Sequence, residues 1–166
     1  MKKLQWPDIE VYEPCSRWQE ERFNRVFPDG ATILEILKAD IINQDKIWVF
    51  SRKGIVPERI QRLFAVRIAR TVQHLMTDQR SIDALDVSER HANGEATDEE
   101  LRIAKDGSRE AAMGLSGVAW AAADAARATA IAAAAVVWDA IWDAAGMTVA
   151  WQAFIPIAIE LIGENE

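Results

Sequence analysis

Cysteine and histidine are scarce in this chain, and their scarcity excludes several kinds of site. Cys15 is the single cysteine among 166 residues, so an intrachain disulfide framework is excluded and a reducing compartment fits the composition. The two histidines, His74 and His91, lie far apart in sequence, and neither is spaced from Cys15 as zinc ligands are. We therefore expect no metal site.

Glycine-rich phosphate loops and nucleotide-binding fingerprints are also absent. Cys15 and a histidine can be paired on paper as nucleophile and base, but their spacing gives no support to such a pair. The acidic run from Glu95 to Glu100 needs no catalytic role, because acids in the first turn of a helix complement its dipole. The sequence predicts a non-enzymatic protein without a cofactor.

No uncharged run is long enough to cross a membrane. The longest, residues 144–159, contains Gly146, Gln152 and Pro156, and a membrane-spanning helix needs about 20 predominantly apolar residues. The first residues are followed by a polar, proline-punctuated stretch rather than the apolar core of a signal peptide. We expect a cytoplasmic protein without a membrane partner.

The composition is that of a folded globular protein, with 50% hydrophobic and 27% charged residues. A chain of this length fits one domain. We expect a single helical domain over residues 1–166, with short helices and turns at 1–56, an amphipathic helix pair at 57–93 and alanine-rich helices at 97–162.

Several helix starts can be located from capping signals. Thr32 with Glu35 and Thr97 with Glu100 have capping-box spacing. Ser16 and Ser81 are expected to cap two further helices, and Pro57 to open a helix that reaches about Met76. Residues 1–15 are expected to be irregular or to form a short strand.

Alanine dominates the C-terminal half, where 17 of the 35 residues from 111 to 145 are alanine and none is proline. Alanine is the best helix former, but an unbroken helix over 98–145 would be about 70 Å long. We expect a break at 107–108 or 114–117, a helix end at Gly146, and a last helix bent or broken at Pro156. The predicted fold is all-α: a compact bundle of about six to eight helices with a long alanine-rich helix or helical hairpin.

Tryptophan and aspartate share one side of the expected alanine-rich helix, and alanine fills the other. The residues concerned are Trp120, Asp124, Trp138, Asp139, Trp142 and Asp143. Either other helices of the chain cover these rings, or the stripe binds a partner protein, since tryptophan is favoured at interaction hot spots. The thin alanine face would let another helix approach closely, including that of a second copy in a homodimer.

The most polarised stretch of the chain is basic. Residues 52–70 carry six cations and one acid, a net charge of +5 in a chain of net charge −7. Four of the cations share one face of the expected 57–76 helix: Arg59, Arg62, Arg67 and Arg70. They meet the acids Asp78, Asp83, Asp86 and Glu89, are simply solvated, or form an anion or nucleic-acid surface. Direct nucleic-acid binding is not expected, because affinity for phosphates needs an excess of positive charge.

One block of the sequence resembles a known group of proteins. It comprises RLFAV at 62–66, VQHLMTD at 72–78, ERHANG at 89–94 and ATDEEL at 96–101. The block is similar to one in a widespread group of phage and prophage proteins, where it follows a Pro-Cys segment like Pro14-Cys15 and precedes an alanine- and tryptophan-rich tail. A looser similarity, confined to the alanine-rich half, is to immunity proteins of bacterial toxin systems. The resemblance implies a phage setting and brings no catalytic motif.

These observations give one leading hypothesis and two alternatives. The leading hypothesis is a phage accessory protein that binds a host protein, such as a nucleic-acid-binding complex of a CRISPR–Cas defence system, and inhibits it. The first alternative is a nucleic-acid-binding module that uses the basic stretch at 52–70. The second is a structural, homo-oligomeric or immunity-type protein that uses the alanine face.

Overall fold

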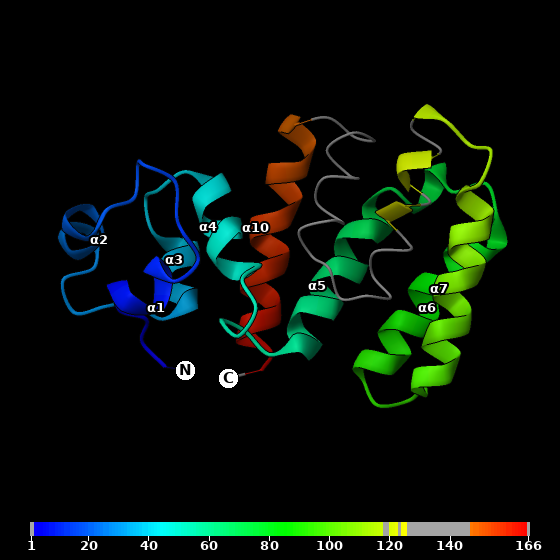
Figure 1. Ribbon diagram of the computed structural model, residues 1–166, viewed down its shortest axis with the longest axis horizontal. Coiled ribbons are helices and arrows are strands. Elements are labelled where there is room, and N and C mark those ends of the chain that lie inside the picture. Colours follow the sequence, from blue (N-terminus) through cyan, green and yellow to red (C-terminus); the bar gives the residue numbers. More distant parts are fainter. Residues whose placement is uncertain (1, 118–119, 123, 126–146, 166) are drawn as a thin grey trace.

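A computed structural model describes residues 2–117, 120–122, 124–125 and 147–165, and this part of the protein is all-α (Figure 1). Four short helices come first: α1 (Trp6–Glu10), α2 (Glu20–Val26), α3 (Ile33–Lys38) and α4 (Asn43–Phe50). The longer helices are α5 (Glu58–Thr71), α6 (Gln79–Ala92), α7 (Asp98–Ala112) and α10 (Met147–Gly163), with a 3₁₀ turn, η1 (Gln73–Leu75), after α5. The prediction of an all-α fold is confirmed.

The helices follow one another along the longest axis of the molecule (Figure 1). Helices α1 to α4 lie at one end, α5 and α10 in the middle, and α6 and α7 at the other end. Helix α10 packs against α3, α4 and α5, while α6 packs against both α5 and α7. The two ends of the molecule therefore present separate surfaces.

An aromatic cluster joins the central helices. The ring of Phe64 on α5 lies 4.6 Å from that of Phe50 on α4 and 6.3 Å from that of Phe154 on α10, measured between centroids. All three side chains are fully buried. Aromatic rings bury large apolar areas, so this cluster makes α10 part of the same core as helices formed more than 80 residues earlier.

Both predicted capping boxes are confirmed. The Thr32 hydroxyl accepts the backbone N–H of Glu35 at 3.2 Å, and the Glu35 carboxylate accepts the backbone N–H of Thr32 at 2.7 Å. Thr97 and Glu100 repeat the same pair of distances at the start of α7. Each box satisfies donors that a helix start leaves without partners.

The other two predicted caps are wrong. Helix α2 starts at Glu20 rather than after Ser16, because Trp18 is held in the preceding turn by a hydrogen bond to Asp45. Helix α6 starts two residues before Ser81, with the Asp78 carboxylate accepting the backbone N–H of Arg80 at 2.9 Å. Ser81 is buried, and among the described residues no group hydrogen-bonds its hydroxyl.

The N-terminal segment is more helical than expected. Residues 6–10 form α1 with Pro7 in its first turn, and Leu4 makes an isolated antiparallel bridge with Ala31 instead of a strand. Helix α5 starts directly after Pro57 but ends at Thr71, five residues before the expected end, and η1 completes the segment. Pro7 lies in the first turn of α1, where a proline costs the helix no hydrogen bond, and Pro57 is the N-cap of α5.

The C-terminal half is interrupted at one of the two expected places. Helix α7 runs through Gly107 and ends at Ala112, and Gly114 in the following turn has a φ of +85°, which favours glycine. Pro156 does not end α10, which continues on both sides of it. The buried residues Phe154, Ala158 and Leu161 stabilise α10 and offset the one hydrogen bond that a proline removes.

Most of the alanine-rich run, including the helix end expected at Gly146, lies outside the described residues. In the described ranges, no helix is both long and apolar enough to cross a membrane.

Candidate functional site

The basic face of α5 meets carboxylates of two neighbouring helices. Arg70 lies 2.9 Å from Asp86 and 2.6 Å from Glu89, both on α6. Arg67 lies 3.3 Å from Glu160 on α10 and 2.9 Å from Glu164 just beyond it. Two of the four acids expected to meet this face therefore do so, and α10 contributes two others.

The remaining two arginines of this face also have partners within the chain. Arg59 donates hydrogen bonds to the side-chain oxygens of Asn93, at 3.0 Å, and Asn165, at 2.6 Å. Arg62 is buried and pairs with Glu58 at 2.9 Å. Arg59 holds α5 against neighbouring segments, whereas the Arg62–Glu58 pair lies within α5. Both sets of contacts leave fewer donors for phosphates than the sequence suggested.

The hairpin of α6 and α7 carries an excess of negative charge. Residues 78–112 contain ten carboxylates against five lysines and arginines, a net charge of −5. The acids at the helix starts are stabilised as anions: hydrogen bonds from the Arg80 side chain and backbone lower the pKa of Asp78 to about 2. Hydrogen bonds from Thr97 and Arg90 likewise lower the pKa of Glu100.

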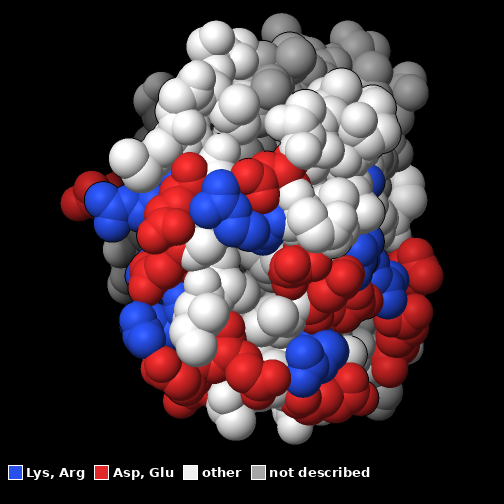
Figure 2. All heavy atoms as spheres, turned by 90° about the vertical axis from the view of Figure 1, so that its right-hand side faces the viewer, with Lys and Arg blue, Asp and Glu red and all other residues white. Residues whose placement is uncertain are grey.

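Large apolar side chains are exposed beside these acids. Ile103 and Met113 have 57% and 74% of their surface exposed, and they lie on α7 and in the turn after it. Figure 2 shows the face formed by this end of the molecule, with acidic and basic side chains over its lower part and uncharged ones across its upper part. We call Glu99, Asp106, Glu110, Ile103 and Met113 the α7 face; all five are exposed. Its three acids form exposed ion pairs, Glu99 and Asp106 with Arg102 and Glu110 with Arg80.

Two of the six predicted partner-binding residues lie in the described part of the chain. Trp120 is 43% exposed, and Asp124 is half-buried. Ala121, Ala122 and Ala125 beside them are buried, so here alanine faces the core and tryptophan faces outward, as the helical projection predicted. Trp138, Asp139, Trp142 and Asp143 lie outside the described residues.

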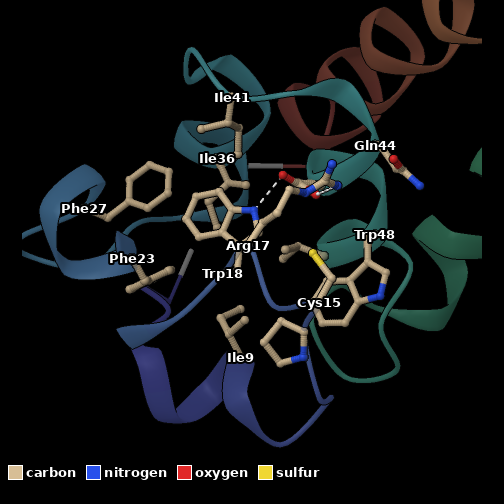
Figure 3. Close-up of a pocket in the computed structure, with 13 residues that line it drawn as sticks. Ile9, Cys15, Arg17, Trp18, Phe23, Phe27, Ile36, Ile41, Gln44 and Trp48 are labelled. Atoms are coloured by element: carbon tan, nitrogen blue, oxygen red, sulfur yellow. Dashed lines mark hydrogen bonds and ion pairs between the residues drawn. The ribbon is translucent and has the colours of Figure 1, made fainter. Parts of the chain in front are cut away.

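A pocket that our sequence analysis did not predict lies at the opposite end, among α1 to α4 (Figure 3). Its cavity has a volume of about 100 Å³. The walls are mostly apolar and come from four helices and from the loop between α1 and α2: Ile9, Pro14, Trp18, Phe23, Phe27, Ile36, Ile41, Trp48 and Val49. Cys15 and Arg17, which also line the pocket, are exposed and mark its opening.

One buried carboxylate forms the polar part of this pocket. Asp45 is 8% exposed and accepts the indole N–H of Trp18 at 2.6 Å. Its other oxygen accepts a longer hydrogen bond, 3.3 Å, from the guanidinium of Arg17. A buried carboxylate is stable only when its oxygens are paired, so these contacts fix the loop that carries Cys15 and Arg17 onto α4.

Arginines also stack on both tryptophans of the pocket. The guanidinium of Arg22 lies 5.0 Å from the ring centroid of Trp18, and that of Arg52 lies 4.8 Å from the ring centroid of Trp48. Both distances are within the range of cation–π attraction. Two guanidinium groups therefore lie on the tryptophans of a pocket whose walls are apolar apart from Asp45 and its opening.

The described residues include no cluster of three or more histidine, cysteine or acidic side chains that could hold a metal ion. Comparison with protein-family models, with curated proteins and with solved structures found no match.

The sequence held one signal for the pocket that our interpretation missed. Asp45 is at helical spacing from Ile41, Trp48 and Val49, which places a carboxylate on the apolar side of α4. A carboxylate on an apolar helix face needs hydrogen-bond donors. Here the donors are Arg17 and Trp18, which lie in a loop, and the spacing of residues in the sequence does not show that this loop packs on α4.

Proposed function

We propose that this protein is a non-enzymatic phage accessory protein that binds a host protein in the host cytoplasm. Its target, on this proposal, is a nucleic-acid-binding component of a defence system such as CRISPR–Cas, which it inhibits. The phage setting rests on the resemblance of the block at residues 62–101.

The observation that carries the proposal is the α7 face. It combines acids with exposed apolar side chains, and exposed Trp120 follows it in the chain. An acidic surface competes for sites that a target has evolved to bind phosphates, while apolar and aromatic residues supply most of the binding energy of an interface. The acids of the α7 face pair with Arg80 and Arg102, whose side chains are 48% and 59% exposed, and such exposed pairs are weak. Arg67 and Arg70, at 30% and 33%, are held between helices, which reduces the case for direct nucleic-acid binding.

Capture from a host lysate with the tagged protein, followed by competition, tests the proposal. We expect one stoichiometric protein partner that binds nucleic acid when alone, and release of that partner as DNA or RNA is added. Release should also increase with salt concentration, because charge pairs at the rim of an interface are screened.

Matched variants at the two ends of the molecule locate the interface. Met113→Ala and Glu110→Gln on the α7 face should weaken capture, and Trp120→Ala should weaken it by about tenfold or more. Val11→Ala and Glu20→Gln change an exposed apolar residue and an exposed acid at the opposite end and should leave it unchanged. Direct binding of nucleic acid, or self-association alone, would contradict the proposal and favour one of the two alternatives.

A further inference from the structure

The pocket among α1 to α4 has the size of a small organic ligand. An apolar cavity of about 150 Å³ takes up a benzene molecule. The cavity here, about 100 Å³ and open at Cys15 and Arg17, accommodates a branched aliphatic group or most of one aromatic ring, with room for a polar group at the opening. Its walls contain Trp18, Phe23 and Trp48, which suit such a group (Figure 3).

Unused hydrogen-bond donors of Arg17 remain at the opening. Both oxygens of Asp45 already accept hydrogen bonds, one from Trp18 and one from Arg17. The guanidinium of Arg17 reaches Asp45 through one nitrogen at 3.3 Å, and 52% of its side chain is exposed. Since arginine carries five N–H donors in a planar fork, Arg17 can take up a second carboxylate while it keeps Asp45.

Charge around the pocket favours an anion as well. Arg22 on Trp18 and Arg52 on Trp48 add two guanidinium groups to that of Arg17. Asp45 offsets part of this positive charge but not all of it, so a ligand carboxylate is favoured over a ligand amine.

We propose that this pocket binds a small carboxylate with an aromatic or branched aliphatic body, the body lying between Ile9 and Trp48 and the carboxylate on Arg17. The pocket lies at the opposite end of the molecule from the α7 face (Figure 1). This site is independent of the proposed host-protein interface and goes beyond that function.

Titration of the whole protein with phenylacetate and 3-methylbutanoate, followed by calorimetry and saturation-transfer NMR, tests the proposal. We expect saturable one-to-one binding with a dissociation constant of about 1 mM or below, since ligands this small gain little binding energy. Benzyl alcohol and benzylamine, which keep the ring but replace the carboxylate, should bind at least about tenfold more weakly.

Two variants assign the site. Arg17→Gln should weaken phenylacetate about tenfold or more and leave benzyl alcohol unchanged, because only the charged contact is lost. Arg25→Gln is the matched control, because Arg25 is an exposed arginine on α2 that pairs with Glu21. The affinity of this variant for phenylacetate should equal that of the parent protein. Ile41→Trp should fill the cavity and abolish binding of all four compounds.

Alkylation of Cys15 by iodoacetamide gives a second readout that depends on the same opening. Bound phenylacetate should slow the reaction, and Arg17→Gln should remove this protection at the same ligand concentration. Absence of saturable binding, equal binding of benzylamine, or an unchanged affinity in folded Arg17→Gln would each overturn the proposal. None of these results depends on whether the α7 face binds a host protein.

Discussion

The indole N–H of Trp18 donates a hydrogen bond of 2.6 Å to the carboxylate of Asp45, a residue 27 positions further along the chain. Both side chains are buried. We expect Asp45→Ala to lower the free energy of unfolding by about 1–3 kcal/mol, because the indole N–H would lose its acceptor in an apolar pocket. Urea unfolding measures the loss.

The control for Asp45→Ala is Asp40→Ala, which removes an exposed aspartate just before α4. Its effect should stay within about 0.5 kcal/mol, as exposed substitutions usually do. Equal effects of the two variants would show that the Trp18–Asp45 bond does not hold the loop.

Small buried residues make the contact between α6 and α7. Ser108 on α7 and Ala84 and Ser88 on α6 are fully buried. Ser108→Leu should overpack this contact and cost about 1–3 kcal/mol. Arg109→Leu introduces the same side chain at the next, exposed position and should cost less than about 0.5 kcal/mol. Thermal unfolding compares the two, and similar midpoints would mean that the hairpin is loosely packed.

Acid should weaken the start of α6. The pKa of Asp78 falls from 3.8 to about 2, so its charged form stabilises the folded state fully above pH 3.8. This contribution is lost as the pH falls from 3.8 to about 2. The difference in unfolding free energy between the parent and Asp78→Asn should therefore be present at pH 5 and vanish near pH 2. A difference that persists near pH 2 would mean that the charge of Asp78 is not its cause.

The arginines of α5 should matter for stability rather than for binding. Replacing Arg59, Arg62 and Arg70 together by glutamine should lower the unfolding free energy. The exposed contacts of Arg59 contribute up to about 1 kcal/mol, and buried Arg62 should contribute more through packing. Capture of the host partner should be unchanged. Salt-sensitive DNA binding by the parent, lost in the triple variant, would overturn this view; fluorescence anisotropy at low salt detects it.

The sequence predicted the features of the fold that are local. Thr32 and Thr97 cap helices because each lies three residues before a glutamate, and nothing distant competes with that pairing. Ser16 and Ser81 have side chains equally suited to capping a helix, yet neither does so. Near Ser16, the hydrogen bond to Asp45 holds Trp18 in a turn, and Ser81 is buried inside α6. Tertiary contacts override a local signal where a neighbouring residue is needed elsewhere.

The candidate sites were predicted unevenly for the same reason. The outward position of Trp120 follows from helical geometry alone. The partners of Arg67 do not, because Glu160 and Glu164 are more than 90 residues away along the chain. The pocket could not be predicted, since its opening and its buried acid come from segments that only folding brings together.

Helix α10 has a consequence for how the chain is made. Its buried side chains Phe154, Leu161 and Ile162 pack into a core whose other walls belong to residues 4–72 and 76–125. During synthesis α10 leaves the ribosome long after α3, α4 and α5. Until then these three helices lack the helix that packs against all of them. Premature termination before residue 147 should therefore yield a chain that is degraded, not a shorter active protein. Chaperones would meet the nascent protein during the same interval.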